Sequence, residues 1–285
     1  DAPTITGSPA ETVYEDTEYV FDANGADIDS IHGDVLRYQV NSAKPDWLNF
    51  NTVTGVLSGT PDNDDVDVYT GIQIGVTDEE ETVSLDVFTI TVVNVNDTPN
   101  ITGVPAGYVS QDVLYEFVAI GSDVDTNDIG NLVYQINDKM PGFMTFNTET
   151  GVLSGTPSND DVNVYSGIEI GVTDEEAIAS LSVFSITVLN VNDGPTLGGV
   201  PSTSVNQGTG YVFSPTYEDI DIQHGDALTF SISTTPTWAT FNVGTGELRG
   251  TPNNGDVGTT NAIVISVTDG DESVSLPSYD LEVIN

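Results

Sequence analysis

The chain has 285 residues, no cysteine and a formal net charge of −41, because 45 acidic residues face only four basic ones. This composition excludes binding to nucleic acid or to an anionic membrane surface, since both need clusters of Lys and Arg. The lack of cysteine excludes disulfides and thiolate metal sites, while a charge this one-sided predicts bound divalent cations, a saline environment, or both.

Hydrophobic residues make up 38% of the chain, and in many segments they alternate with polar residues at the period of half-buried β-strands. In chain order, strands are predicted over residues 36–40, 71–77, 87–93, 132–136, 167–173, 183–189, 228–233 and 262–268. Turn sequences such as Thr54-Gly55, Thr150-Gly151 and Asp269-Gly270 separate them, and no segment has the apolar stripe of a helix. About seven short strands in each third of the chain indicate an antiparallel β-sandwich.

Two sequence patterns recur along the chain. The hexapeptide at 56–61 (Val-Leu-Ser-Gly-Thr-Pro) returns at 152–157, and a variant of it occupies 247–252. The spacing of about 96 residues suits a row of small domains rather than a solenoid. Asn-Val-Asn-Asp-x-Pro follows the first two units, at 94–99 and 190–195, and we call each of these connections a joint.

We therefore predict an all-β chain of three tandem Greek-key, seven-stranded β-sandwiches arranged end to end, over residues 1–97, 98–193 and 194–285. The joints contain no Gly/Ser-rich spacer, so the domains are expected to touch. Because residues 1–3 match the end of a joint and residues 283–285 its beginning, the chain is expected to be a segment of a longer array.

Acidic pairs recur at the same phase of each unit, as Asp27/Asp29, Asp123/Asp125 and Asp219/Asp221. Calcium takes six to eight oxygen ligands, which carboxylates, amides and backbone carbonyls supply. An Asn/Asp-rich linker beside an Asp-x-Asp loop therefore favours calcium binding at the joints. The alternative is an acidic, solvated surface typical of halophiles, whose charges have no reason to stay in register.

Each unit resembles the dystroglycan-type cadherin-like (CADG, or putative Ig) repeats of bacterial extracellular adhesins. The resemblance rests on residues 50–61, 76–78 and 94–99 with their copies, and it covers essentially the whole chain. It implies calcium ions, several in number and mainly at the joints. Where cadherins carry an Asp-Arg-Glu motif this chain has a longer loop, in which Asp65 and Asp161 are the candidate substitutes.

The resemblance also implies the metal-ligating residues. At the first joint they are Asp65, Asn94, Asn96, Asp97, Asp123, Asp125 and Asp174. At the second joint they are Asp161, Asn190, Asn192, Asp193, Asp219, Asp221 and Asp269. A half-site before the first unit comprises Asp1, Glu11, Asp27, Asp29 and Asp78. Later units offer Gln111 and Gln207 instead of an early glutamate, which predicts fewer or weaker sites there.

Other sites are less well supported. The 123–134 segment lacks the Gly and the closing Glu of an EF-hand, and the two histidines, His32 and His224, are far apart for a zinc site. Trp47, Phe143 and Trp238 occupy equivalent Pro-x-aromatic positions, where they could stack on sugars but are expected to be core residues. No carboxylate pair differs from its copies as a catalytic pair would, so we expect the chain not to be an enzyme.

These patterns predict a calcium-rigidified extender or stalk segment of a large secreted or cell-surface bacterial adhesin. The alternative is a calcium-dependent carbohydrate-binding or homophilic adhesion module. The expected partners are neighbouring repeats of the same longer chain, with a cell-surface glycan or another adhesin as further candidates. The expected location is extracellular, without direct membrane insertion.

Overall fold

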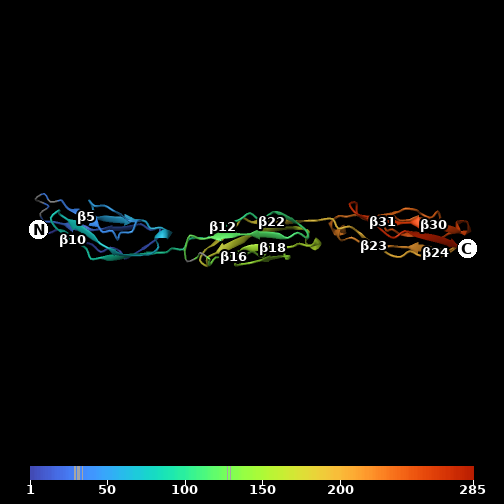
Figure 1. The fold of residues 1–285 in the computed structure, drawn as a ribbon, viewed down its shortest axis with the longest axis horizontal. Coiled ribbons are helices and arrows are strands. Elements are labelled where there is room, and N and C mark those ends of the chain that lie inside the picture. Colours follow the sequence, from blue (N-terminus) through green and yellow to red (C-terminus); the bar gives the residue numbers. More distant parts are fainter. Residues whose placement is uncertain (29, 31–32, 34, 127, 129) are drawn as a thin grey trace.

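The structure is a computed structural model and describes residues 1–28, 30, 33, 35–126, 128 and 130–285. Three elongated β-sandwiches follow one another in a row, with the two termini at opposite ends (Figure 1). The described residues contain no α-helix. The predicted fold class, three tandem β-sandwiches in an all-β chain, is confirmed.

Each unit is built from short strands and one or two turns of 3-10 helix. The strands of unit one are β1 (Thr4–Thr6), β2 (Thr12–Tyr14), β3 (Tyr19–Asp22), β4 (Asn24–Ala26), β5 (Arg37–Val40), β6 (Asn49–Phe50), β7 (Val56–Gly59), β8 (Val68–Ile72), β9 (Ile74–Thr77), β10 (Thr82–Ser84) and β11 (Phe88–Val93). Those of unit two are β12 (Asn100–Thr102), β13 (Tyr108–Ser110), β14 (Tyr115–Val118), β15 (Ile120–Ser122), β16 (Val133–Ile136), β17 (Met144–Phe146), β18 (Val152–Gly155), β19 (Val164–Ile168), β20 (Ile170–Thr173), β21 (Ile178–Ser180) and β22 (Phe184–Leu189). Those of unit three are β23 (Thr196–Gly198), β24 (Ser204–Asn206), β25 (Tyr211–Phe213), β26 (Thr216–Glu218), β27 (Thr229–Ile232), β28 (Ala239–Phe241), β29 (Leu248–Gly250), β30 (Gly258–Ile263), β31 (Ile265–Thr268), β32 (Ser273–Ser275) and β33 (Tyr279–Ile284). The described 3-10 helices are η2 (Asn63–Asp65), η3 (Asn159–Asp161), η4 (Ile220–His224) and η5 (Asn254–Asp256).

The sheet topology is the same in all three units, and unit one illustrates it. One layer has the order β3-β7-β6, and the pair β1-β4 extends it. The other layer contains β5-β9-β10 and β2-β11-β8, which are continuous because only Gln73 separates β8 from β9. Strand β2 pairs with β11 in parallel. Both strands therefore run in the same direction, toward the end of the sandwich where unit two begins.

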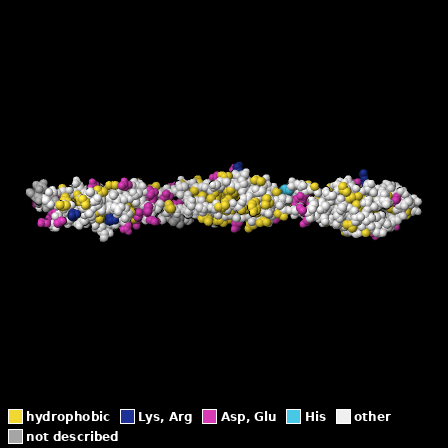
Figure 2. All heavy atoms as spheres, turned by 90° about the horizontal axis from the view of Figure 1, so that it is seen from above, with side chains coloured by type: hydrophobic (Ala, Val, Ile, Leu, Met, Phe, Trp, Pro, Cys, Tyr) yellow, Lys and Arg dark blue, Asp and Glu magenta, His cyan; other side chains and the backbone are white. Residues whose placement is uncertain are grey.

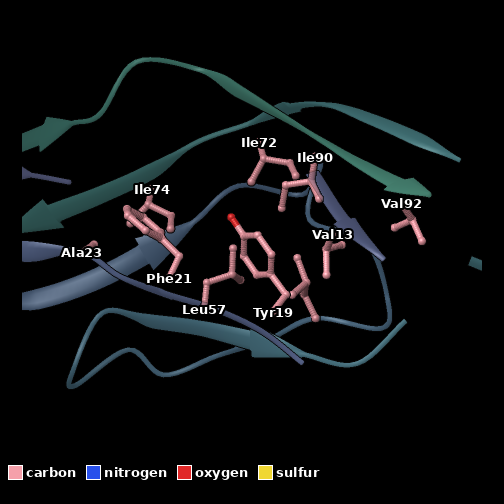
Figure 3. Close-up of a cluster of buried hydrophobic side chains, with 10 residues drawn as sticks. Val13, Tyr19, Phe21, Ala23, Leu57, Ile72, Ile74, Ile90 and Val92 are labelled. Carbon is pink, nitrogen blue, oxygen red and sulfur yellow. The ribbon is translucent and has the colours of Figure 1, made fainter. Parts of the chain in front are cut away.

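Alternating side chains from both layers fill the core of each unit. In unit one Leu57, Ile72, Ile74 and Ile90 are fully buried, and Tyr19 lies among them (Figure 3). Strand β3 has the burial pattern in-out-in-out that the period-two sequence predicts. Burial of this apolar surface is the main force that stabilises a unit without disulfides.

The Pro-x-aromatic residues belong to the cores, as expected. Trp47 is partly buried against the core of unit one, edge-on to Tyr19 at 6.1 Å and to Tyr69 at 6.2 Å between ring centroids. Phe143 and Trp238 pack against the cores of units two and three. Because one side of each ring is committed to the core, these residues are poor platforms for stacking sugars.

The repeated motif builds a turn and a close strand contact. The side chain of Asn51 accepts hydrogen bonds from the N–H groups of Val53 and Thr54, and Gly55 then adopts the left-handed conformation at φ 81°. At Gly59 a Cβ would collide with the carbonyl oxygen of Trp47, so only glycine fits. The fold itself therefore requires this motif, and its recurrence does not by itself indicate a function.

Candidate metal centres at the joints

The end of the motif fixes a turn that delivers Glu15 to the first joint. The carbonyl of Pro61 accepts a 2.8 Å hydrogen bond from the N–H of Asp16, which has φ 56°. The N–H of Glu15 donates to Val93 at 3.1 Å, directly after the parallel β2–β11 pairing. Glu15 is therefore held against the end of the last strand of its unit, where the linker begins.

Three carboxylates meet at the first joint, each from a different part of it. Glu15 comes from unit one, Asp97 from the linker and Asp125 from unit two. One oxygen of each lies within 4.8 Å of the others. Glu15 is 1% exposed and Asp125 is fully buried, so water screens this cluster poorly.

Hydrogen bonds orient these carboxylates but leave one buried oxygen of Glu15 and one of Asp125 without a partner. Glu15 accepts from the N–H of Val95 through Oε1, and Asp125 accepts from the N–H of Asp97 through Oδ2 at 2.7 Å. Asn63 in η2 donates to Asp97 at 2.7 Å. Among the described residues, the buried side-chain oxygens without a hydrogen-bond partner at this joint are Glu15 Oε2, Asn63 Oδ1, Asp123 Oδ2 and Asp125 Oδ1.

A second group of carboxylates flanks this cluster on the side of unit two. Asp174 accepts from the N–H groups of Ala177 at 2.6 Å and Glu176 at 2.7 Å, and from the side chain of Asn96 at 3.1 Å. These donors, the N–H of Ala177 foremost, hold the pKa of Asp174 below its usual value. Asp128 lies nearby, and partial burial, followed by repulsion from Asp123, raises its pKa.

The second joint keeps part of this arrangement. Asp221 is fully buried and accepts from the N–H of Asp193 at 2.6 Å, as Asp125 does from Asp97. Asp269 accepts from the N–H groups of Glu272 and Asp271 and from Asn192, and these bonds, Glu272 first, lower its pKa. Here the buried oxygens without a partner, among the described residues, are Asn159 Oδ1, Asp219 Oδ2, Asp221 Oδ1 and Asp226 Oδ2.

The acidic cluster at the second joint belongs to unit three alone. Asp219, Asp226 and Asp269 bring one oxygen each within 4.8 Å of the others. Partial burial, followed by repulsion from Asp219, raises the pKa of Asp226. Figure 2 shows acidic side chains at both places where adjacent units meet. The two joints are therefore both acidic but differ in which residues form the cluster.

The structure brings most of the predicted joint residues together, but not all. Asp65 and Asp161 turn back to their own helices, where their carboxylates accept the N–H groups of Asp62 at 3.1 Å and Ser158 at 2.8 Å. The neighbouring asparagines of the same helices, Asn63 and Asn159, make the contacts to the joints. Asn94 and Asn190 lie at the start of each linker.

The predicted half-site before unit one is only partly assembled. Asp27 follows β4, whose pairing with β1 places it near Asp1, and Asp78 lies in the turn after β9 at the same end. Backbone donors, Glu81 first, lower the pKa of Asp78. Glu11 lies at the start of β2, part-way toward the other end, and Asp29 falls outside the described residues.

Sequence reasoning missed Glu15 because it sought an early glutamate at the wrong end of the unit. Residues 4–14 all run toward the first joint, so Glu15 lies about 13 Å beyond Glu11 at the strand rise of about 3.3 Å per residue. The sequence did contain a signal for Glu15. It directly follows the alternating polar and apolar residues of β2, so it stands at the end of that strand.

The residues at the first joint fit calcium. They offer buried carboxylate and amide oxygens that lack protein donors, with no nitrogen or sulfur ligand in the cluster. That donor set suits a hard cation of calcium type and is unlike a zinc site. The acidic clusters at both unit boundaries could accordingly hold metal ions.

The sequence model of the family described as "Putative Ig domain" (He_PIG) matches residues 2–93, 98–189 and 194–284. The chain belongs to this family. Its three units are Ig-like He_PIG domains in tandem, a kind of repeat typical of extracellular proteins. No curated protein matches the chain. No described helix is long and apolar enough to cross a membrane.

Several solved structures are similar at low identity. The first two domains of human mucin-like protocadherin share 14% identity at a TM-score of 0.42, covering 65% of this chain and 98% of that one. A three-domain I-band fragment of titin shares 12% at 0.31, covering 99% and 98%. An endo-fucoidan hydrolase of glycoside hydrolase family 107 shares 20% at 0.30, covering all of this chain, which spans 44% of the hydrolase. These similarities are too low to assign a function.

Proposed function

We propose that this chain is a non-catalytic extender segment of a secreted or cell-surface bacterial adhesin, stiffened by calcium at its joints. The observation that carries the proposal is the meeting of Glu15, Asp97 and Asp125 from two units and the linker between them. Buried oxygens of Glu15 and Asp125 there have no protein partner. A cation placed among them would bond to both units at once and fix their relative orientation.

The electrostatics support a bound cation. At 4.8 Å and an effective dielectric constant of about 20, each ionised pair repels by about 3.5 kcal/mol. A cluster of three ionised carboxylates therefore opposes the closed joint unless a cation binds among them. A divalent ion converts the same three groups from a repulsive set into a cross-link.

The end-to-end arrangement supports an extender function rather than a catalytic one. Both acidic clusters lie where successive domains meet (Figures 1 and 2), and the one at the first joint draws its carboxylates from two units and the linker between them. A chain of rigid domains with stiff joints transmits force and sets a distance. Extracellular calcium concentrations are high enough for modest sites of this kind to be filled.

Small-angle scattering of the three-unit chain in calcium and in chelator tests the proposal. We expect a single rod-like form with calcium, and a broader distribution of dimensions without it. Equal curves, together with no heat of calcium binding by titration calorimetry, would contradict it. A positive signal for the same chain on a glycan array would favour a carbohydrate-binding module instead.

A further inference from the structure

The two joints differ at one position that the repeat makes equivalent. Gln111 occupies in unit two the place that Glu15 occupies in unit one, directly after β13 as Glu15 follows β2. Both backbones bond to the last strand of their unit, and both side chains accept from the linker, Gln111 from the N–H of Val191 at 3.2 Å. The backbone and one side-chain oxygen therefore play the same part in both joints.

The other end of the side chain behaves differently. The Nε2 of Gln111, which is 2% exposed, donates a 3.0 Å hydrogen bond to Oδ2 of Asp193. Asp193 is the equivalent of Asp97, whose carboxylate lies within 4.8 Å of that of Glu15 at the first joint. At the second joint the linker carboxylate therefore accepts a hydrogen bond from an amide. At the first joint the equivalent linker carboxylate lies beside another carboxylate. A cation is not needed to hold Gln111 and Asp193 together.

Direct contacts between units also close the second joint. The side chain of Asn159 donates to the carbonyl of Ile220 at 3.0 Å, and Nε2 of His224 lies 3.0 Å from the carbonyl oxygen of Asn159. These bonds join η3 of unit two to η4 of unit three. At the first joint the equivalent asparagine, Asn63, bonds to the linker instead.

We propose that the residue at position 15 or 111 decides whether a joint depends on calcium. Glu15 makes the first joint one that a divalent cation must bridge, and Gln111 makes the second joint one that hydrogen bonds close without a bridging ion. The inference rests on the proposed calcium function, and it adds that the rod has one calcium-dependent hinge, between units one and two. The acidic cluster Asp219, Asp226 and Asp269 binds its ion within unit three, so filling it does not by itself cross-link two units.

Distances between paired spin labels across each joint test this directly, because the chain has no cysteine of its own. One double variant carries Val68→Cys and Ile120→Cys across the first joint. The other carries the equivalent exposed positions, Val164→Cys and Thr216→Cys, across the second. Each is measured in chelator and in calcium, as wild type and with Glu15→Gln or Gln111→Glu added.

In the wild-type background we expect calcium to narrow the distance distribution across the first joint and to leave the second, already narrow, unchanged. Glu15→Gln should abolish the narrowing at the first joint by making it narrow in chelator too. Gln111→Glu should broaden the second joint in chelator and create a calcium response there. Exposed positions supply charge-matched controls, Glu149→Gln and Gln135→Glu, which should change neither joint.

Two results overturn the inference in different ways. If both joints respond equally to calcium in the wild-type background, positions 15 and 111 do not decide whether a joint depends on calcium. The proposed function of calcium at the joints would be unaffected by that result. If neither joint responds and calorimetry detects no calcium binding, the proposed function fails together with the inference.

Discussion

The Glu15→Gln variant replaces a buried carboxylate by a neutral amide of the same shape at the first joint. Without calcium it removes the repulsions of Glu15 from Asp97 and Asp125, each about 3.5 kcal/mol at 4.8 Å if all groups are ionised. We expect rotation of the side chains away from one another to relieve most of that repulsion in the wild type. The new amide can also donate to Asp97, as Gln111 does to Asp193, so we expect a net stabilisation of about 2 kcal/mol.

With calcium the effect should change sign. A ligand present at about one hundred times its Kd contributes about 2.7 kcal/mol to the free energy of unfolding, and the variant loses much of this term. Because 1 kcal/mol shifts the Tm of such a domain by about 4–8 °C, both changes are measurable. Scanning calorimetry of wild type and variant should therefore give a higher Tm for the variant in chelator and a lower one in calcium.

A variant that melts below wild type in both solutions would refute this reasoning, because it would mean that Glu15 stabilises the fold without an ion. The exposed Glu149→Gln variant, with the same loss of charge, should match wild type in both scans.

Three further predictions concern a glycine in a turn, two buried tyrosines and a contact at the second joint. Gly151→Ala should destabilise unit two by at least about 1–2 kcal/mol, since Gly151 has φ 68° and a Cβ there would lie 2.7 Å from a backbone oxygen; Gly142→Ala, in open space, is the matched control in thermal unfolding. Burial raises the pKa of Tyr19 and Tyr115 to about 12, so the contribution of these two tyrosines to the free energy of unfolding should be constant up to about pH 10 and fall between pH 10 and 12, as denaturant titrations at several alkaline pH values can check. Asn159→Ala should weaken the contact between units two and three by about 1 kcal/mol and broaden the distribution of label distances across the second joint. An unchanged distribution would mean that this hydrogen bond does not help to fix the orientation of the two units.

The sequence predicted the fold well because its signals are local. Period-two alternation gave the strands, and the Thr-Gly turn and the close contact at Gly59 explain why the motif recurs in each unit. The linker residues Asn96 and Asp97 bond to the loop residues Asp174 and Asp125 of unit two, since their position depends only on the units stacking end to end.

The rest of the site depends on long-range geometry that spacing does not reveal. Glu15 reaches the joint only because β2 pairs in parallel with β11, a contact between residues about eighty positions apart. Asp65 satisfied the acidic pattern, but the cap of its own 3-10 helix uses its carboxylate and leaves Asn63 to face the joint. Asp226 aligns with Gly130 in unit two, where the corresponding carboxylate is that of Asp128, two residues earlier, so a search for acids in strict register passed over both.

The account depends most on an ion shared by Glu15, Asp97 and Asp125, and a crystal structure of the chain grown with calcium examines it most directly. We predict a strong anomalous peak among these three carboxylates, with oxygen distances of about 2.3–2.6 Å. Carboxylates turned out to solvent around a joint that holds only water would contradict the account.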